Sequence, residues 1–261
     1  MTNIHPSAIV DEKATIDPST EIGPFCVIGP LVTIGPNCKI HSHVVIEGRT
    51  TIGSDCEIFS FACLGKAPQH LRYEGEDSEL IIGHHNIIRE HVTMHKGTKI
   101  GIMKTVIGNH SMFMASSHVA HDCIVGDHFI LAQNAALGGH CEVADNVYFG
   151  AYSAAHQNVR IGHGAMIGGL TAVIDDVIPF GCLVGERAKL QGLNVVGMRR
   201  RGMEKSEVRA INNAFQELFK GKGSFEENLA HVKNEFADNP AVRDIIDFIE
   251  EGGIRSLSRA E

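Results

Sequence analysis

The sequence contains no tryptophan and three tyrosines among its 261 residues. This low content of large rings excludes an aromatic-rich core and favours a core of aliphatic side chains. No apolar run approaches the roughly 18 residues that a membrane-spanning helix needs. Residues 1–11 also lack the basic start and apolar stretch of a signal peptide. We therefore expect a soluble, cytoplasmic protein.

The composition also argues against disulfide or zinc-binding sites, nucleic-acid binding and a collagen structure. The seven cysteines are odd in number and form no CxxC motif, so neither a disulfide framework nor a zinc knuckle is indicated. The net charge of -8 argues against nonspecific binding of nucleic acid. The 28 glycines do not recur at every third position, which excludes collagen.

What the sequence does contain is a six-residue repeat. An aliphatic residue recurs at every sixth position from Ile4 to Leu64, and the same register returns over 82–94 and 107–173. This period excludes both an α-helix and a heptad coiled coil. A small or β-branched residue usually stands four positions after the aliphatic one. Five cysteines occupy that position: Cys26, Cys38, Cys56, Cys123 and Cys141.

The repeat predicts short parallel strands joined by tight corners, over residues 4–184. Each coil pairs with its neighbours at about 4.8 Å, and the large aliphatic side chains fill the interior. Glycine often follows the aliphatic residue, and we expect it to supply unusual corner dihedrals. The pattern Ile/Val/Leu-Gly-x-x-small-x resembles the hexapeptide motif of the left-handed β-helix family. That resemblance, and not the period, implies the left-handed parallel β-helix.

The chain divides into two predicted domains. A β-helix is expected over residues 1–190, with inserted loops at 66–80 and 95–106 where the register breaks. Inserted loops in such solenoids often form the binding face. Residues 191–261 carry apolar residues at helical spacing and predict a small three-helix domain covering the end of the prism. The expected helices are 206–220, from Ser224 to about 236, and 240–251.

A basic cluster lies between the two parts. Arg199, Arg200 and Arg201 are followed by Lys205 and Arg209. Such a run is ordinarily a solvated face. In an acidic protein, however, it is the clearest candidate for holding a phosphate or an acidic partner.

Four of the 16 histidines stand in distinctive segments: His118 and His121 in SSHVAHDC, His140 in LGGH, and His156 in SAAHQ. One turn of three hexads takes 18 residues, and His121, His140 and His156 are separated by 19 and 16 residues. We therefore expect these three near one corner on successive coils, about 5 Å apart vertically. They would form a row of imidazoles beside a groove.

Three interpretations of these histidines compete. They could be incidental surface residues, metal ligands, or a general base with neighbours that position a substrate. No two histidines are five apart, as in the His-x4-His pair of carbonic anhydrases with this repeat, so we expect no metal site and no cofactor. Asp122 directly follows His121 and could fix its tautomer. Cys123 lies inside by register and is not expected to be a nucleophile.

The repeats and the segments SSHVAHDC, LGGH, AHQ, IGG and NVVGMRRRG, followed by a helical tail, closely resemble the UDP-N-acetylglucosamine O-acyltransferase family. The resemblance covers essentially the whole chain. It implies transfer of an R-3-hydroxyacyl chain from acyl carrier protein to the glucosamine 3-position of UDP-N-acetylglucosamine. This is the first step of lipid A biosynthesis. It also implies a homotrimer with sites between subunits.

The resemblance assigns roles to individual residues. His121 resembles the base that deprotonates the sugar hydroxyl, Asp122 would orient it, and the Gly139 N–H would stabilise the oxyanion, with no covalent intermediate. The other assigned residues line the sugar and acyl pocket (His118, His140, His156 and Gln157) or hold the nucleotide, its phosphates or the carrier's phosphopantetheine (Asn194, Arg200 and Arg201). Gly169 falls where the family sets acyl length, and a glycine there predicts a chain nearer C14 than C10.

Two departures from the family pattern concern the sugar. The segment 69–73 begins Gln69-His70, and many members have Asp and Lys at the places of His70 and Arg72, which contact the sugar. Val196 also replaces a common Glu near the uracil. Arginine keeps the charge of lysine but changes its geometry. Some members acylate a 3-amino sugar nucleotide and form an amide, and this alternative stays open.

Other functions fit the sequence less well. The related N-acyltransferase carries an extra N-terminal domain, whereas the repeats here start at residue 4. Small acetyl-CoA-dependent acetyltransferases of this repeat class usually have fewer coils and no helical tail. A non-enzymatic scaffold that binds a carrier protein would leave the histidine row idle.

Overall fold

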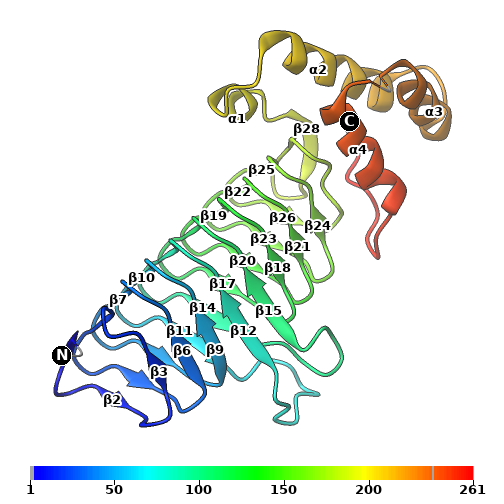
Figure 1. Ribbon diagram of the computed structural model, residues 1–261. Coiled ribbons are helices and arrows are strands. Elements are labelled where there is room, and N and C mark those ends of the chain that lie inside the picture. The colour runs from blue at the N-terminus through cyan, green and yellow to red at the C-terminus, as the bar shows by residue number, and fades with distance from the viewer. Residues whose placement is uncertain (1–2, 237, 261) are drawn as a thin grey trace.

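The computed structural model describes residues 3–236 and 238–260, and there the chain forms a three-sided prism of parallel strands with helices at its C-terminal end (Figure 1). The prism is the predicted left-handed parallel β-helix. Its three faces are called sheets A, B and C here. Successive strands of the chain pass from A to B to C, so each sheet gains one strand per turn.

Sheet A contains β1 (Asn3–Ile4), β4 (Glu21–Ile22), β7 (Lys39–Ile40), β10 (Glu57–Ile58), β13 (Ile87–Ile88), β16 (Met112–Phe113), β19 (Ile130–Leu131), β22 (Tyr148–Phe149), β25 (Met166–Ile167), β27 (Gly181–Val184) and β28 (Lys189–Leu193). Sheet B contains β2 (Ile9–Val10), β5 (Val27–Ile28), β8 (Val45–Ile46), β11 (Cys63–Lys66), β14 (Thr93–His95), β17 (His118–Val119), β20 (Ala136–Leu137), β23 (Ala154–Ala155) and β26 (Ala172–Val173). Sheet C contains β3 (Thr15–Ile16), β6 (Val32–Ile34), β9 (Arg49–Ile52), β12 (Glu79–Ile82), β15 (Lys104–Ile107), β18 (Ile124–Val125), β21 (Glu142–Val143) and β24 (Arg160–Ile161).

The aliphatic position of the repeat sets the register of the coils. Ile58 pairs with Ile40 below it and with Ile88 above it, and all three side chains are buried. Neighbouring coils thus place like residues on top of one another and fill the interior continuously. The five cysteines at the small position are buried as predicted.

Most glycines that follow the aliphatic position have a different role from the one predicted, although Gly65 does have the unusual dihedral expected (φ 76°). Gly23 and Gly53, which follow the aliphatic position, do not have positive φ; the left-handed corner residues come two positions later, at Phe25 and Asp55 (φ 59° and 57°). A Cβ on Gly23 would lie 2.9 Å from the carbonyl carbon of His41 in the next coil. Glycine is therefore needed because the coils approach closely at the corner.

The two insertions leave the prism at one edge, between sheets B and C (Figure 1). Strand β12 includes residues 79–80 of the first predicted loop, and β15 includes residues 104–106 of the second. The insertions themselves are therefore shorter than predicted. They span 67–78 and 96–103.

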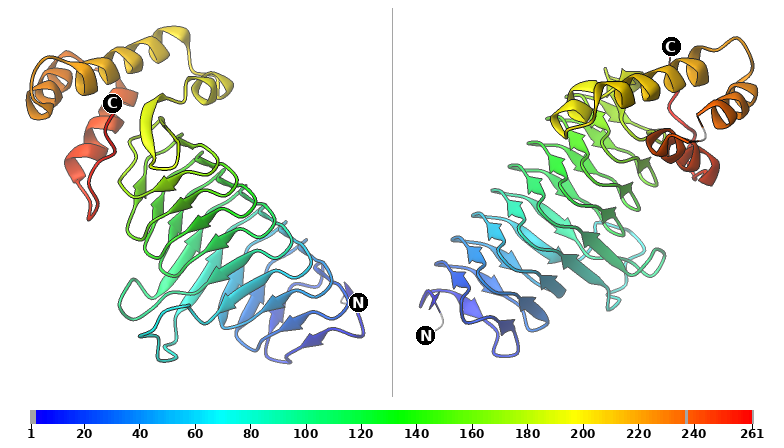
Figure 2. Two further views of the ribbon diagram at one scale, coloured as in Figure 1. Left: turned by 180° about the vertical axis from the view of Figure 1, so that it is seen from behind. Right: turned by 45° about the horizontal axis from the view of Figure 1, so that its top comes forward.

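The predicted helices form at the C-terminal end: α2 (Lys205–Lys220), α3 (Phe225–Glu235) and α4 (Pro240–Glu251). Ser224 caps α3 with the expected capping box to Glu227. A short helix that the sequence analysis missed, α1 (Val195–Arg200), precedes them, so the described residues contain four helices and not three. Helix α2 lies across the end of the prism, and α4 turns back beside its last coils (Figure 2).

Buried side chains of these helices continue the core of the prism. Ile211 and Phe215 of α2 and Val242 of α4 belong to the same apolar cluster as Ile178 of the last coil. The helices therefore cover apolar surface that the final coil would otherwise expose. Among the described residues, no helix is long and apolar enough to cross a membrane.

Candidate active site

The candidate site occupies the edge of the prism between sheets B and C, where both insertions emerge. Each of three successive coils has one corner residue in the left-handed conformation at this edge. These residues are Asp122, His140 and Asn158 (φ 59°, 61° and 62°). Asp, Asn and His adopt positive φ more readily than most side chains. The strand register places His121 level with Gly139 and Gln157 on the coils above it.

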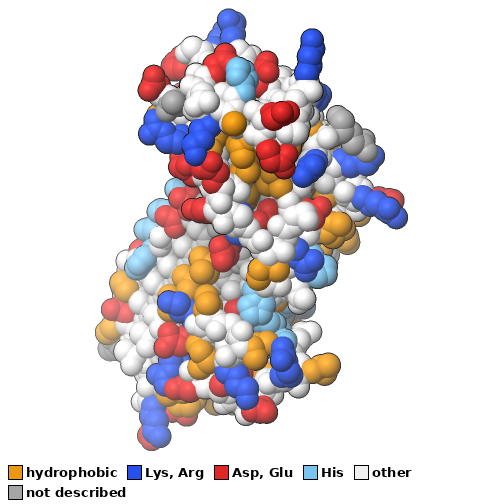
Figure 3. Space-filling model, turned by 90° about the vertical axis from the view of Figure 1, so that its right-hand side faces the viewer, with side chains coloured by type: hydrophobic (Ala, Val, Ile, Leu, Met, Phe, Trp, Pro, Cys, Tyr) orange, Lys and Arg blue, Asp and Glu red, His pale blue; other side chains and the backbone are white. Residues whose placement is uncertain are grey.

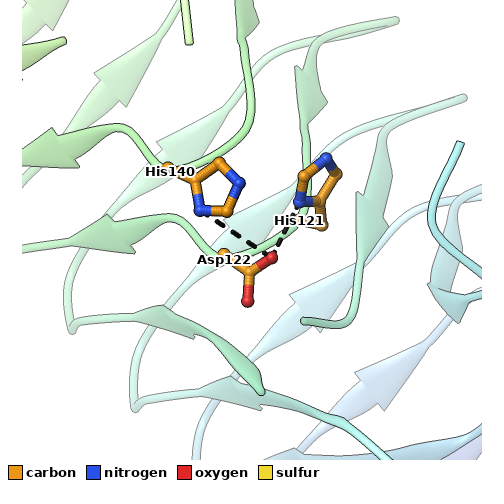
Figure 4. Close-up of side chains that lie close together, drawn as sticks. All are labelled: His121, Asp122 and His140. Carbon is orange, nitrogen blue, oxygen red and sulfur yellow. Dashed lines mark hydrogen bonds and ion pairs between the residues drawn. The ribbon is translucent and has the colours of Figure 1, made fainter. Parts of the chain in front are cut away.

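The centre of the site is a histidine–aspartate pair. His121 Nδ1 and Asp122 Oδ2 are 2.8 Å apart, and the two residues are 8% and 3% exposed (Figure 4). His140 approaches the same carboxylate oxygen, with its Nδ1 at 3.9 Å. Asp122 therefore lies between two imidazoles and is hydrogen-bonded to one of them.

Residues of the second insertion hold the carboxylate in place. The Thr98 N–H (3.0 Å) and the Ile102 N–H (3.0 Å) donate to Asp122 Oδ1, and the Thr98 hydroxyl (2.6 Å) donates to Oδ2. Burial raises the pKa of Asp122, but the hydrogen bonds from His121 and Thr98 outweigh it and lower the pKa below its usual value. Asp122 is thus a buried carboxylate that stays ionised.

The ring of His121 is surrounded by two further imidazoles and a glycine. The ring centroids of His70 and His140 each lie 5.0 Å from that of His121, in edge-on orientations. A Cβ on Gly139 would lie 2.6 Å from His121 Cε1. Within the described residues, the Gly139 N–H donates no hydrogen bond. It is therefore free to bind an oxygen next to His121.

A second group of histidines lies behind the first. His118 Nδ1 is 2.7 Å from the Thr93 hydroxyl, and its ring meets that of His95 edge-on at 5.0 Å. Burial, with the nearby His118 and His121, lowers the pKa of His95 to about 4. Burial and His121 also lower the pKa of His118. Both rings are neutral at physiological pH, and the His118 ring is hydrogen-bonded to Thr93.

The predicted row of three imidazoles is only partly formed. His121 and His140 are in ring contact, but none of the ring contacts among the described residues joins His140 to His156. The register places His156 level with Gly138, two positions before His140 on its own coil. Residues 18 positions apart lie directly above one another. The 16 residues between His140 and His156 therefore displace the His156 side chain along the corner relative to His140. His156 is instead contacted by Arg255.

The predicted residues of the first insertion reach the same edge to different degrees. His70 contacts His121, whereas Gln69 and Arg72 are exposed and lie beside it in the loop. The His70 ring accepts a hydrogen bond from the Arg72 N–H (3.2 Å). Figure 3 shows histidine side chains in the lower half of this side of the molecule, near exposed basic side chains.

Asn194, Arg200 and Arg201 lie elsewhere, over the outer face of sheet A. Together with Tyr148, they line a groove of ≈ 610 Å³. Asn194 caps α1 by accepting the Gly197 N–H (2.9 Å) and donates to the Gly164 carbonyl (3.0 Å). The remaining predicted residue, Gly169, stands at a third place, the corner between sheets A and B. A single subunit therefore does not bring the three groups together.

The side chains of His121, Asp122 and His140 could also bring ligand atoms within 4.8 Å of one another for a metal ion. The Asp122 carboxylate, however, already accepts four hydrogen bonds, from Thr98 (two), Ile102 and His121. Four is about the number of acceptor positions that a carboxylate has. A metal ion would have to displace one of these donors, so the arrangement fits a proton-transfer pair better than a metal centre.

Sequence reasoning missed four residues that shape the site: His95, Thr98, Ile102 and Arg255. Thr98 and Ile102 belong to an insertion without the repeat, so no register places them. Arg255 follows α4, 98 residues after the carbonyl of Gln157 that it binds. His95 ends the last strand before the second insertion. Its position at the start of the second predicted loop (95–106), where the repeat breaks, was the available signal.

Comparison with known proteins places the chain among acyltransferases. Residues 176–257 match the family model for domain 2 of UDP-N-acetylglucosamine O-acyltransferase. The acyl-(acyl-carrier-protein)–UDP-N-acetylglucosamine O-acyltransferase of Caulobacter vibrioides is 49% identical, over 99% of this chain and 98% of the relative. The protein of that name from Rhizobium etli is 45% identical, over 98% and 94%. The crystal structure of UDP-N-acetylglucosamine O-acyltransferase from Moraxella catarrhalis superposes with a TM-score of 0.94 at 38% identity, covering 99% of this chain and 100% of that one.

Proposed function

This chain belongs to the UDP-N-acetylglucosamine O-acyltransferase family, and from that premise we propose that it moves an R-3-hydroxyacyl chain from acyl carrier protein to the glucosamine 3-hydroxyl of UDP-N-acetylglucosamine. This reaction is the first step of lipid A biosynthesis. The observation that carries the proposal is the buried His121–Asp122 pair beside the free Gly139 N–H. It combines a general base, its orienting carboxylate and an oxyanion donor at one corner.

In the proposed mechanism, His121 acts as the general base. The Asp122 carboxylate accepts the Nδ1 proton of His121, which leaves the lone pair on Nε2 to take the proton of the sugar hydroxyl. The hydroxyl oxygen then attacks the thioester carbonyl of the acyl donor. The negative charge that develops on the carbonyl oxygen is stabilised by the Gly139 N–H.

The tetrahedral intermediate collapses by breaking the carbon–sulfur bond. The imidazolium of His121 returns its proton to the departing thiolate, so the carrier leaves with a free thiol and the base is restored. No covalent acyl-enzyme is needed. Cys123, the cysteine nearest to the pair in sequence, is fully buried, and burial raises the pKa of its thiol well above the usual value.

The proposed substrate contacts follow from the same corner. His70 and His140 flank the base and would contact the sugar, with Gln69 and Arg72 at the rim. His118, His156 and Gln157 would line the adjacent sugar and acyl pocket. Asn194, Arg200 and Arg201 would bind the nucleotide phosphates or the phosphopantetheine of the carrier from a neighbouring subunit of a homotrimer.

An acyl chain of about fourteen carbons is proposed for the donor. The outer face of sheet B carries Ala136, Ala154 and Ala172 in register above His118, and these small side chains leave space along the face. Gly169 precedes Leu170 at the far corner of this face and adds no side chain there. A clear preference for a C10 donor in chain-length assays would contradict this part of the proposal.

A second candidate function is amide formation on a 3-amino sugar nucleotide. One observation favours it: the ring of His70 lies beside His121, at a place where many members of the family have Asp. An imidazole there would recognise a hydroxyl or an amine differently from a carboxylate. The fold, the base and the oxyanion donor would be the same for both acceptors.

One acyl-transfer assay distinguishes the two candidate functions. Purified protein is offered 3-hydroxyacyl carrier proteins of C10 to C16 together with UDP-N-acetylglucosamine or its 3-amino analogue, and the products are resolved by mass. We expect ester formation on UDP-N-acetylglucosamine, abolished in His121→Ala. Amide formation on the amino sugar alone would establish the second candidate. No transfer to either acceptor would refute both.

A further inference from the structure

The C-terminal tail, residues 252–260, is fixed to the last coil of the prism. Gly252 ends α4 with φ 63° and turns the chain back. The Asp176 N–H then donates to the Ser256 carbonyl (2.7 Å), and the Ser258 N–H donates to the Asp176 carbonyl (2.8 Å). The tail thus adds parallel bridges to the open edge of the β-helix, at Leu257 and Ala260. In Figure 1, α4 descends beside the last coils, and the tail (red) turns below it and runs back up to the C-terminus.

A buried ion pair determines where the tail begins. Arg160 Nε donates to Asp176 Oδ2 (2.8 Å), and Asp176 is 1% exposed. The Arg160 guanidinium also lies over the Phe248 ring (4.4 Å) and donates to the Phe248 carbonyl (3.1 Å). Gly253 packs directly on this pair, since a Cβ there would lie 2.4 Å from Asp176 Oδ2. These contacts of Arg160 and Asp176 with Phe248 and Gly253 therefore fix the course of the chain from α4 into the tail.

This path brings the tail to the active-site edge. Gly252, Gly253 and Ile254 line a cavity of ≈ 430 Å³ whose other walls include Asp122 and His140. Arg255 Nε donates to the Gln157 carbonyl (2.9 Å), and its Nη2 contacts His156 Nδ1. The half-buried Arg255 side chain of the tail therefore binds the corner at His156 and Gln157, two coils after the corner that holds His121 and Asp122.

The contact with Arg255 defines the chemical form of His156. A guanidinium has donors only, so in this contact His156 Nδ1 accepts the hydrogen bond and carries the lone pair. The Gln157 carbonyl lies 3.4 Å from the same Nδ1, but it already accepts the shorter hydrogen bond from Arg255 Nε (2.9 Å). The ring is then neutral, with its proton on Nε2. The exposed ring of His156 thereby offers an N–H donor at this corner, suited to an oxygen acceptor on the substrate, such as a hydroxyl or carbonyl group.

We propose that Arg255 is a positioning residue that fixes the tautomer and orientation of His156 and so completes the substrate pocket. The substrate part of this inference rests on the proposed acyltransferase function, whereas the tautomer does not. Arg255 acts through another residue and touches no reacting atom. Loss of the guanidinium would leave His156 free to rotate and to change tautomer.

The test compares Arg255→Gln with Arg259→Gln, a matched removal of one cation from the same tail. Arg259 lies over the Phe225 ring, away from the site. We expect Arg255→Gln to lower kcat/KM about tenfold or more, with an unchanged Tm. Arg259→Gln should match the wild type. Equal losses in both variants, or a loss that only follows Tm, would overturn the proposal.

Two further measurements isolate the mechanism. In a His156→Ala background, Arg255→Gln should have little additional effect, because the arginine acts through that ring; a full, additive loss would contradict this. Histidine-labelled ¹⁵N NMR, assigned with His156→Gln, should show His156 protonated on Nε2 alone in the wild type and a tautomer mixture in Arg255→Gln. Inactivity of the wild-type protein would refute the proposed function, whereas an Nδ1-protonated His156 would refute this inference.

Discussion

Among single residues, Asp122 has the most constrained surroundings in the site. Three donors from the second insertion and one from His121 surround its carboxylate. Removing any one of these donors would leave a buried oxygen of the carboxylate with one hydrogen bond fewer. The carboxylate therefore has a single orientation. That orientation places the Nδ1 proton of His121 and leaves Nε2 as the base.

Replacing Asp122 by Asn should abolish catalysis while preserving the fold. The Asn oxygen would accept the Thr98 and Ile102 N–H groups, so its amide would donate to His121 Nδ1 and force the proton onto Nε2. We expect kcat to fall by about 10²- to 10⁴-fold, as for loss of the carboxylate in other histidine-based sites. Asparagine also tolerates the positive φ at this position. Steady-state acyl transfer and Tm would be measured together.

Asp17→Asn is the matched control for this prediction. Asp17 likewise accepts the N–H and the hydroxyl of one residue, Ser19, at an exposed corner far from the site. We expect full activity in that variant. If Asp122→Asn retained more than about a tenth of the wild-type kcat, tautomer control by Asp122 would be refuted.

His95 makes stability depend on pH. Its pKa is lowered to about 4 in the folded protein, so below the unfolded value of about 6.5 the unfolded chain binds a proton that the folded chain does not. Stability is therefore lost as the pH falls, by about 2 kcal/mol per subunit between pH 7 and pH 5. His95→Phe should remove this loss. Urea unfolding of both proteins at the two pH values measures the difference, and equal losses would contradict the assignment.

At the scale of elements, the corner between β20 and β21 is constrained by the coil below it. Gly139→Ala needs no change in backbone conformation, because its φ is not positive, but the new methyl group would lie 2.6 Å from His121 Cε1. The imidazole must then move away from Asp122. We expect activity to fall at least about 100-fold while Tm changes by a few degrees at most, because the rest of the corner is unaffected.

Gly29→Ala tests whether the loss is specific to that corner. There the added Cβ would meet its nearest neighbour, Glu47 Cα, at 3.4 Å, which is an ordinary contact. That variant should keep its activity and its Tm. A Gly139→Ala protein as active as Gly29→Ala would show that the position of His121 tolerates the methyl group.

The strands of the repeat are predictable from the sequence, whereas the contacts of residues outside the repeat are not. The six-residue period fixes the strands and the buried positions because each coil repeats the packing of the one before it. Phe129 departs from the pattern at a small-residue position, yet it is fully buried because its ring meets Phe113 and Phe149 edge-on at 5.8 and 5.9 Å. Thr98 and Arg255 follow no period, so their contacts appear only in three dimensions.

The whole molecule places its predicted binding groups on different faces. His121 lies at the edge between sheets B and C, whereas Arg200 and Arg201 line a groove over sheet A, on the opposite side of the prism. One nucleotide sugar cannot bridge a prism filled with side chains. If both groups bind the same substrate, they must belong to different subunits, as in the proposed homotrimer with sites between neighbours.

Subunit mixing tests this arrangement. His121→Ala and the double variant Arg200→Ala/Arg201→Ala should each be nearly inactive alone, the first without its base and the second without its anion-binding pair. Co-expressed in equal amounts, they should assemble into mixed trimers. A shared site is intact when one subunit supplies His121 and its neighbour supplies both arginines, which occurs in about one quarter of sites if assembly is random.

About a quarter of wild-type activity in the mixture would therefore establish sites between subunits. A site built within one chain predicts a different result, because every chain in the mixture lacks one of its two parts. Activity would then stay at the level of the separate variants whatever the ratio of chains. Varying that ratio adds a second check, since shared sites predict maximal activity at equal amounts and a symmetric fall on either side.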